Sequence, residues 1–123
     1  MAKVFKVLIA EDEKPMATAL ELKLNKSGFQ AKAVFDGGSA IEILEREKYN
    51  LLLLDLMMPR IDGFEVMRKI AELGIKTNVI VLSNLSQEED RKKALEMGAM
   101  DYFVKSDTPI SEIVKRVSDF LKK

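Results

Sequence analysis

The decisive stretch of this sequence is Leu51-Leu52-Leu53-Leu54-Asp55-Leu56-Met57-Met58-Pro59. Four consecutive leucines are typical of a strand that is buried on both faces of a sheet. The strand ends in a carboxylate, and burying an Asp is costly unless a cation or hydrogen bonds meet it. Asp55 therefore either points toward a ligand at the edge of the sheet or caps the next turn, and it is the leading candidate for the reactive group.

The composition excludes several classes of chemistry. The chain has no Cys and no His, which removes thiolate nucleophiles, disulfides, ordinary zinc sites, Ser-His-Asp triads and imidazole acid–base catalysis. Lys and Arg number 20 and Asp and Glu number 20, so the net charge gives no general attraction to nucleic acid or anionic lipid. Carboxylates, lysines, hydroxyls and metals that prefer oxygen ligands remain.

Length and hydropathy indicate one domain. The 123 residues are 47% hydrophobic, which is enough apolar material for a single core across residues 1–123. No apolar run approaches the roughly 20 residues of a membrane span, and the N-terminus lacks the layout of a signal peptide. We expect a cytoplasmic protein that touches neither a membrane nor nucleic acid directly.

Turn and cap residues divide the chain into alternating strands and helices. The expected strands cover residues 4–10, 29–35, 51–55, 78–83 and 99–105. The expected helices cover residues 13–27, 39–47, 62–74, 86–98 and 108–121. Three helices start with a predicted N-cap followed three residues later by Glu, namely Ser39 with Glu42, Asp62 with Glu65, and Ser86 with Glu89. Three helices end in glycine before a strand, at Gly28, Gly74 and Gly98.

This alternation predicts an α/β fold. Strands that alternate with helices pair in parallel through right-handed crossovers, with helices on both faces of the sheet. We predict a doubly wound five-stranded parallel sheet in the order 2-1-3-4-5, with five helices. Ligands of such sheets bind outside the carboxyl ends of the strands, so functional residues are expected there.

Polar residues follow several predicted strands at this edge. They are Glu11, Asp12 and Glu13 after the first strand, Asp55 on the third, Ser83 on the fourth and Lys105 on the fifth. Each alone has an ordinary explanation as a cap, turn or surface residue, but their joint placement indicates a site. Carboxylates that share a cleft repel one another and favour a divalent cation. With only oxygen ligands available we expect Mg²⁺, for which Mn²⁺ should substitute.

The same residues fit phosphoryl transfer. This reaction depends mostly on positioning and charge neutralisation. A metal, the Lys105 amine and the Ser83 hydroxyl can provide both around an Asp. Aspartate is a covalent acceptor of phosphoryl groups in other proteins, so we expect Asp55 to become an aspartyl phosphate.

Four motifs resemble those of bacterial response-regulator receiver domains of the chemotaxis-regulator type, and the resemblance covers essentially the whole chain. The motifs are Val7-Leu8-Ile9-Ala10-Glu11-Asp12-Glu13, Leu53-Leu54-Asp55-Leu56-Met57-Met58-Pro59 with Asp62-Gly63, Val81-Leu82-Ser83, and Gly98-Ala99-Met100-Asp101-Tyr102-Phe103-Val104-Lys105. The resemblance implies a flavodoxin-like receiver fold. It also implies that Asp55 accepts a phosphoryl group from the phosphohistidine of a sensor histidine kinase or a phosphotransfer protein.

The resemblance assigns roles to individual residues. The implied ligands of Mg²⁺ are Glu11, Asp12, Asp55 and the backbone carbonyl of Met57. The implied contacts of the phosphoryl oxygens are Ser83 and Lys105, and the implied switch residues are Ser83 and Tyr102. In that mechanism Ser83 moves toward the phosphoryl group and Tyr102 turns inward.

The resemblance further implies a signalling switch in a phosphorelay, not an enzyme with a separate substrate, although the domain assists its own phosphorylation and dephosphorylation. Phosphorylation would bias a two-state surface of the fourth helix, fifth strand and fifth helix toward an unknown downstream protein. The implied kinase contacts lie on the first helix, at Lys14, Pro15 and Thr18. We expect a monomer or a phosphorylation-dependent dimer.

Two positions depart from the family pattern, and two others bear on the lifetime of the phosphoryl group. Ser106 stands where the family usually has proline, often with a cis bond; a cis bond to a non-proline residue costs about 2.5–4 kcal/mol, so a trans, differently shaped loop is expected. Asn84 replaces a smaller residue after Ser83 and can shield the phosphoryl group or hydrogen-bond to it. Met57 and Leu85 lack the polar groups that would orient an attacking water, so we expect slow self-dephosphorylation.

Other classes of protein stay open. One alternative is a receiver-like interaction module that works without phosphorylation, which Ser106 slightly favours and which Asp12, Asp55 and Lys105 argue against. Another is a small flavin-binding protein or a metal-dependent phosphatase on a similar sheet. The phosphatase lacks support because Asp12 is not in an Asp-x-Asp context, and a flavin-binding protein would need a phosphate-cradling loop after the first strand. Labelling with acetyl phosphate or phosphoramidate in Mg²⁺ tests the interaction module, and a yellow purified protein would indicate flavin binding.

Overall fold

The protein is built around one parallel sheet. The computed structural model describes residues 3–85 and 87–122. The strands are β1 (Lys6–Ala10), β2 (Gln30–Val34), β3 (Leu51–Asp55), β4 (Asn78–Ser83) and β5 (Asp101–Val104). They lie in the order β2-β1-β3-β4-β5, and every neighbouring pair is parallel. The predicted class and strand order are confirmed.

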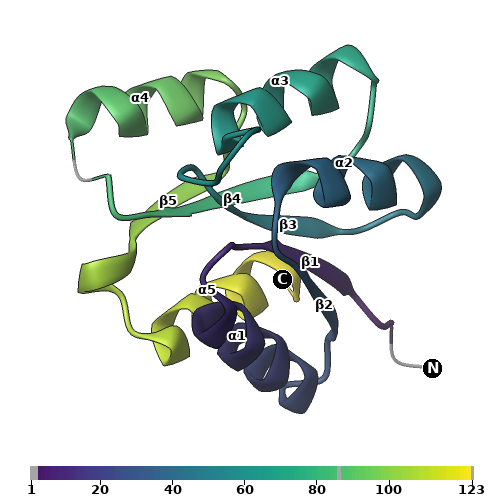
Figure 1. Cartoon of the computed structure of the whole chain (residues 1–123). Helices are drawn as coiled ribbons and strands as arrows, with labels where there is room; N and C mark the ends of the chain where they lie inside the picture. The colour runs from purple at the N-terminus through teal and green to yellow at the C-terminus, as the bar shows by residue number, and fades with distance from the viewer. Residues whose placement is uncertain (1–2, 86, 123) are drawn as a thin grey trace.

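Helices cover both faces of the sheet (Figure 1). On one face lie α1 (Lys14–Lys26) and α5 (Ile110–Leu121). On the other lie α2 (Gly37–Arg46), α3 (Gly63–Glu72) and α4 (Glu88–Glu96). A short 3₁₀ turn, η1 (Lys105–Asp107), connects β5 to α5. This two-sided arrangement is the doubly wound architecture that the alternation of elements predicts.

The four leucines of β3 explain why the sheet needs helices on both faces. Leu51 and Leu53 pack in the core beneath α1 and α5, while Leu52 and Leu54 pack beneath α2 and α3. All four are fully buried. Because successive side chains of a strand point to opposite faces, an unbroken apolar run is what a central strand between two helical layers requires.

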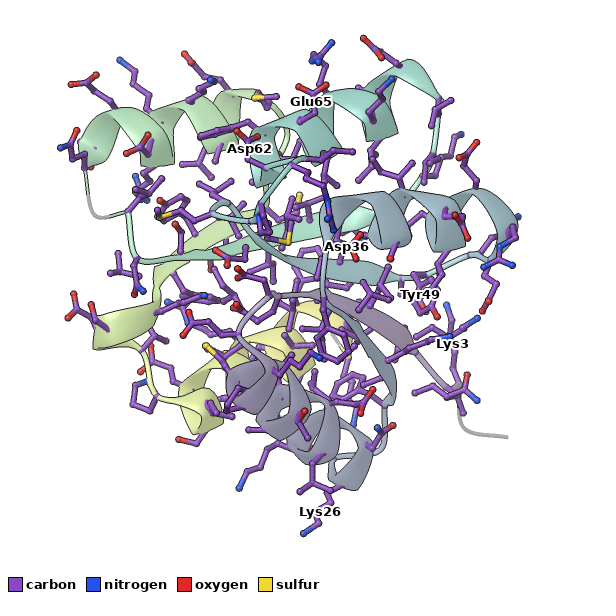
Figure 2. The ribbon with its side chains drawn as sticks, viewed as in Figure 1. Lys3, Lys26, Asp36, Tyr49, Asp62 and Glu65 are labelled. Atoms are coloured by element: carbon purple, nitrogen blue, oxygen red, sulfur yellow. The ribbon has the colours of Figure 1, made fainter. Side chains whose placement is uncertain are left out.

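The structure confirms one of the predicted N-caps and corrects another. The Asp62 carboxylate accepts a hydrogen bond from the Glu65 backbone N–H at 2.9 Å, as predicted (Figure 2). The N-cap predicted at Ser39 is wrong, because α2 begins earlier and its N-cap is Asp36, which accepts from the Ser39 N–H at 2.7 Å. The reason lies at Gly37, where a Cβ would come within 2.8 Å of Val66 Cγ2. This glycine packs the first turn of α2 against α3 and is not part of a turn before the helix.

Further helix and strand ends differ from the expected ones by a few residues. The last strand ends at Val104, so Lys105 lies in η1 and not on the strand. Pro109 is the N-cap of α5, one residue before the helix. The N-cap predicted at Ser86 is wrong, because the N-cap of α4 is Gln87; Ser86 itself lies outside the described residues. The described part of the chain contains no cis peptide bond, which agrees with the trans bond expected before Ser106.

Candidate functional site

The parallel sheet brings the predicted site residues to one edge. Asp55 is the last residue of β3 and Ser83 the last of β4, while Glu11 directly follows β1 and Lys105 directly follows β5. Three of these side chains are almost completely buried, since Glu11 is 1%, Asp55 2% and Ser83 0% exposed. Buried polar residues at adjacent strand ends require partners, which makes this edge the candidate site.

Three carboxylates converge at the edge. Ligand oxygens of Glu11, Asp12 and Asp55 all lie within 4.8 Å of one another. Glu11 Oε1 is buried, and it faces the Lys105 amine. Three carboxylates around a single amine carry more negative charge than the amine balances, and an all-oxygen donor set of this kind fits a hard divalent cation, since such ions take oxygen ligands and Mg²⁺ typically uses only a few carboxylates. The residues present therefore fit a metal.

The Lys105 amine lies among carboxylates and is itself buried, with 6% of its side chain exposed. Its Nζ atom is 2.5 Å from Glu11 Oε1, 2.9 Å from Glu13 Oε1 and 3.1 Å from Asp55 Oδ2. Burial opposes the charged amine, but the contacts with Glu11, Glu13 and Asp55 outweigh burial and raise the pKa of Lys105 above its usual range. The amine stays a fixed positive charge at the edge of the sheet.

The surroundings of the Asp55 carboxyl change its pKa. Burial raises the pKa of Asp55 to about 7, and the negative charge of Glu11 acts in the same direction. The Met57 backbone N–H, which donates to Asp55 Oδ1 at 3.1 Å, and the Lys105 amine act against this rise. Desolvation disfavours the charged form of a carboxylic acid. The carboxylate of Asp55 therefore needs additional positive charge to ionise fully.

The loop after β3 is held close beneath Asp55 by a glycine. The Gly63 N–H donates to the Leu56 carbonyl at 3.0 Å. A Cβ on Gly63 would lie 2.6 Å from the Asp55 carbonyl oxygen and 2.7 Å from Leu56 Cα. The Met57 side chain projects from this loop and is 55% exposed. Only a residue without a side chain lets the start of α3 approach the end of β3 so closely.

Ser83 and Tyr102 are connected through one loop residue. The Ser83 hydroxyl accepts a hydrogen bond from the Leu85 N–H at 3.1 Å, and the Tyr102 hydroxyl donates to the Leu85 carbonyl at 2.7 Å. Burial raises the pKa of Tyr102, which is 8% exposed. Its ring is thus already turned inward in this structure, whereas the family mechanism expects an inward turn upon phosphorylation.

Glu13 contacts the site residues, although the sequence placed it at this edge without assigning it a role as a ligand or contact. Its carboxylate reaches Lys105 across 92 positions of the chain. The only sequence signal was that Glu13 is the third acid in the run after β1, and acids there commonly begin a helix.

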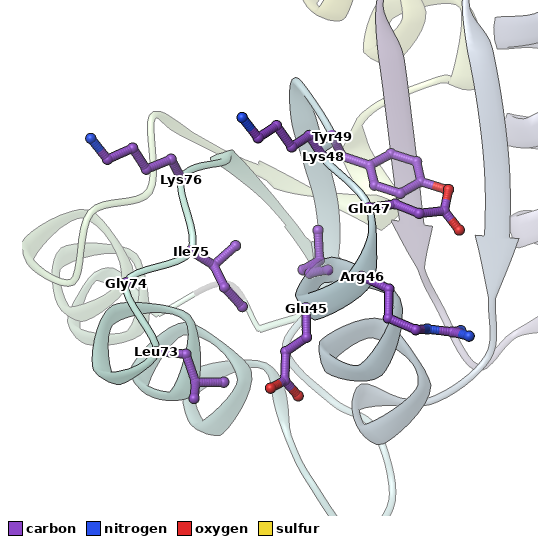
Figure 3. A pocket seen from close by; sticks show the side chains of 10 residues that line it. Glu45, Arg46, Glu47, Lys48, Tyr49, Leu73, Gly74, Ile75 and Lys76 are labelled. Carbon is purple, nitrogen blue, oxygen red and sulfur yellow. The ribbon is translucent and has the colours of Figure 1, made fainter.

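A separate hollow lies at the opposite end of the sheet (Figure 3). It is a cavity of about 570 Å³ between the C-terminal ends of α2 and α3. Its lining includes Leu44, Glu45, Leu73 and Ile75, and it shares no residue with the carboxylate cluster.

Comparison with known proteins identifies the family. The family model described as response regulator receiver domain matches residues 7–118. The chain belongs to the response regulator receiver family. This receiver domain is 36% identical over 100 residues to the transcriptional regulatory protein DltR of Streptococcus agalactiae, covering 81% of this chain and 45% of that protein.

Two further relatives agree. The receiver domain is 33% identical over 118 residues to the alkaline phosphatase synthesis transcriptional regulatory protein PhoP of Bacillus subtilis, covering 96% of this chain and 49% of that protein. Its fold matches the receiver domain of the Francisella response regulator 1452 with a TM-score of 0.88 and 32% identity, covering 95% and 96% of the two chains.

The receiver domain thus spans about half the length of the curated relatives it matches. Those relatives are named transcriptional regulatory proteins, so the expectation that the protein does not touch nucleic acid finds no support among them. Within the described residues no helix is long and apolar enough to cross a membrane.

Proposed function

We propose that Asp55 accepts a phosphoryl group from the phosphohistidine of a sensor histidine kinase or a phosphotransfer protein, in a Mg²⁺-dependent reaction that switches a protein-interaction surface. The observation that carries this proposal is the convergence of buried Glu11, buried Asp55 and the buried Lys105 amine at adjacent strand ends. Membership of the receiver family supports it. In this function residues 1–123 act as one receiver domain and as a cytoplasmic phosphoacceptor, not as an enzyme with a separate substrate.

In the proposed step an Asp55 carboxylate oxygen attacks the phosphorus of the phosphohistidine. The bond between phosphorus and the acyl oxygen forms as the phosphorus–nitrogen bond breaks, and the nitrogen keeps the bonding electrons. The Lys105 amine, 3.1 Å from Asp55 Oδ2, is placed to bind an oxygen of the incoming group. The Ser83 hydroxyl donates a hydrogen bond to another phosphoryl oxygen.

The metal belongs to this proposal as a ligand of named residues. Glu11, Asp12, Asp55 and the Met57 carbonyl would hold Mg²⁺, or Mn²⁺ in its place, and the ion would supply charge neutralisation. The three carboxylates within 4.8 Å support the assignment. Before any transfer, the chain's own contribution is to keep Asp55 beside Lys105 and away from bulk water.

The output would pass through the loop after β4. A phosphoryl group that draws the Ser83 hydroxyl toward it would lengthen the 3.1 Å hydrogen bond that this hydroxyl accepts from the Leu85 N–H. The Leu85 carbonyl in turn holds the Tyr102 hydroxyl at 2.7 Å. A movement of Ser83 would therefore be passed through Leu85 to the surface of α4, β5 and α5. The Tyr102 ring is already buried before this movement. That surface would recognise an unknown downstream protein, or a second copy of the domain in a phosphorylation-dependent dimer.

Docking of the phosphodonor would use α1, next to the site. Lys14, Pro15 and Thr18 are all exposed at its N-terminal end. Because α1 starts directly after the acids that follow β1, a partner bound there lies close to Asp55.

The test is the intact mass of the protein after incubation with acetyl phosphate or phosphoramidate in Mg²⁺. We expect the wild type to gain the mass of one phosphoryl group, and Asp55→Asn to gain none. Asp119→Asn, on the exposed face of α5, serves as the matched control and should label like the wild type. A wild type that gains no mass would overturn the proposal in favour of a phosphorylation-independent interaction module.

A further inference from the structure

Glu13 contacts Lys105 from the first position before α1. It is the N-cap residue of α1, yet its side chain makes no capping hydrogen bond. Pro15 in the first turn has no N–H, which removes one of the donors that an N-cap side chain usually satisfies. The Glu13 carboxylate instead reaches Lys105 at 2.9 Å. Its free orientation at the start of α1 is thus used for the site and not for the helix.

Glu13 also differs from the other two partners of Lys105. Glu11 and Asp55 are buried, whereas the Glu13 side chain is 56% exposed. The described oxygens that cluster within 4.8 Å belong to Glu11, Asp12 and Asp55. A cation held by that cluster would attract the carboxylates of Glu11 and Asp55 in competition with the Lys105 amine. The Glu13 carboxylate would still contact the amine.

We propose that Glu13 competes with the incoming phosphoryl group for the Lys105 amine and thereby slows phosphorylation of the site. This role rests on the proposed function, because it concerns the same amine. Glu13 acts through Lys105 and is a positioning residue. Its negative charge at the mouth of the site also repels an anionic phosphodonor, which works in the same direction. Removing the charge while keeping the shape should release the amine for the phosphoryl oxygens.

The first experiment measures the rate of phosphorylation of Glu13→Gln by acetyl phosphate in Mg²⁺, followed by intact mass. The interaction of an exposed ion pair predicts a rate roughly two- to fivefold higher than that of the wild type at low ionic strength. Because the Glu13 side chain is 56% exposed, salt should weaken its effect, so the ratio of the two rates should fall as the salt concentration rises toward about 1 M. A merely structural effect of the substitution would not fall with salt.

The second experiment needs neither donor nor metal. Brief treatment with an amine-acylating reagent, followed by peptide mass spectrometry, reports how tightly the Lys105 amine is held. We expect Glu13→Gln to increase acylation of Lys105 relative to exposed Lys92 in the same sample. Glu45→Gln, which removes an exposed carboxylate at the opposite end of the sheet, should leave both the acylation ratio and the phosphorylation rate unchanged.

The outcomes separate this role from the proposed function. If neither the wild type nor Glu13→Gln takes up phosphate, the proposed function fails, and the role of Glu13 fails with it. If both proteins are phosphorylated at equal rates, or the variant more slowly, only the competition is overturned. A faster variant whose advantage is the same at low and high salt also contradicts it.

Discussion

The carboxyl and amino ends of the sheet use similar residues in opposite ways. At the carboxyl end, the Lys105 side chain is 6% exposed and contacts the buried acids Glu11 and Asp55. At the amino end, the Lys6 side chain is 34% exposed and pairs at 3.2 Å with Glu47, which is 45% exposed. The Lys6 amine also lies 4.5 Å from the centre of the Tyr49 ring. The first arrangement withdraws charge from water, and the second leaves it solvated.

This difference shows what marks the site in the fold. The hollow of about 570 Å³ lies at the amino end, where the ion pair is ordinary surface chemistry (Figure 3). The carboxyl end is distinguished instead by buried charges that cannot all be neutralised by one lysine. Exposed pairs contribute little, whereas an unpaired buried charge is costly. Buried acidic side chains, more than concave shape, mark the candidate site of this protein.

The largest difference between the two ends of the sheet is expected when Lys105 and Lys6 are each removed. Lys105→Met leaves two buried carboxylates without their cation, and we expect the free energy of unfolding to fall by about 3 kcal/mol or more in the presence of a chelator. Lys6→Met should shift the unfolding transition very little, because Glu47 returns to water. Urea denaturation of both variants measures this. Added Mg²⁺ should restore part of the loss in Lys105→Met only; equal losses in the two variants would contradict the comparison.

Substitution of one glycine near each end, Gly63 and Gly74, tests whether the backbone is also more tightly packed at the carboxyl end. In Gly63→Ala the new methyl group would meet the backbone of Asp55 and Leu56 at 2.6 and 2.7 Å, so the loop beneath the site must move. Overpacking of this kind predicts a loss of about 3 kcal/mol in the free energy of unfolding. Gly74→Ala, beside the distant cavity, meets no atom within 4 Å and carries only the strain of its φ of 68°. We expect Gly74→Ala to lower the free energy of unfolding by about 1 kcal/mol.

The phosphorylation rate separates the two glycines further. Gly63→Ala should label slowly with acetyl phosphate because Asp55 is displaced, while Gly74→Ala should label at the wild-type rate. If Gly63→Ala were as stable and as reactive as the wild type, the close approach of α3 to β3 would have no role in positioning Asp55.

The sequence allowed the central part of the fold to be predicted to the residue. The bounds of β3 and β4 match because a buried apolar run ends at Asp55 and at Ser83, and the topology then follows from the alternation of strands with helices. The start of α2 did not follow, because Asp36 and Ser39 are both good N-caps. The choice between them depends on how Gly37 packs against Val66, which is a tertiary contact.

The site was predictable only in part for a similar reason. Strand ends bring Glu11, Asp55 and Lys105 to one edge in any parallel sheet of this order, so their proximity followed from topology. The contact between Glu13 and Lys105 did not, because an acid at the start of a helix has an ordinary local explanation. Which acid turns toward the lysine depends on side-chain geometry that no sequence spacing encodes.

The pH dependence of stability gives a smaller test of buried charge. Without metal the pKa of Asp55 is raised to about 7, so its contribution to stability is present below about pH 4 and is lost as the pH rises through 7. At pH 8 the wild type therefore carries the cost of a buried carboxylate. Asp55→Asn removes this cost but also weakens the contact with Lys105. As the net result at pH 8, we expect the variant to be more stable than the wild type by about 1–2 kcal/mol.

Thermal unfolding with a chelator at pH 8 and pH 5 checks this expectation. The advantage of Asp55→Asn should shrink at pH 5, where the wild-type carboxyl is largely protonated, and Mg²⁺ should reduce it at pH 8. Asp119→Asn provides the exposed control. An advantage that does not change with pH would mean that burial does not hold the proton on Asp55.

The smallest expected effect concerns the lifetime of the aspartyl phosphate. Met57 at the carboxyl end is 55% exposed and Leu73 at the amino end is 48% exposed, so both accept substitution without disturbing the core. An apolar Met57 cannot orient a water toward the phosphoryl group, which predicts slow self-dephosphorylation. Met57→Asn supplies such a group and should shorten the lifetime several-fold, measured as loss of phosphorylated mass after the donor is removed. Leu73→Asn should leave the lifetime unchanged, because a polar group affects hydrolysis only where it reaches the attacking water. A wild-type lifetime of seconds would contradict the prediction at once.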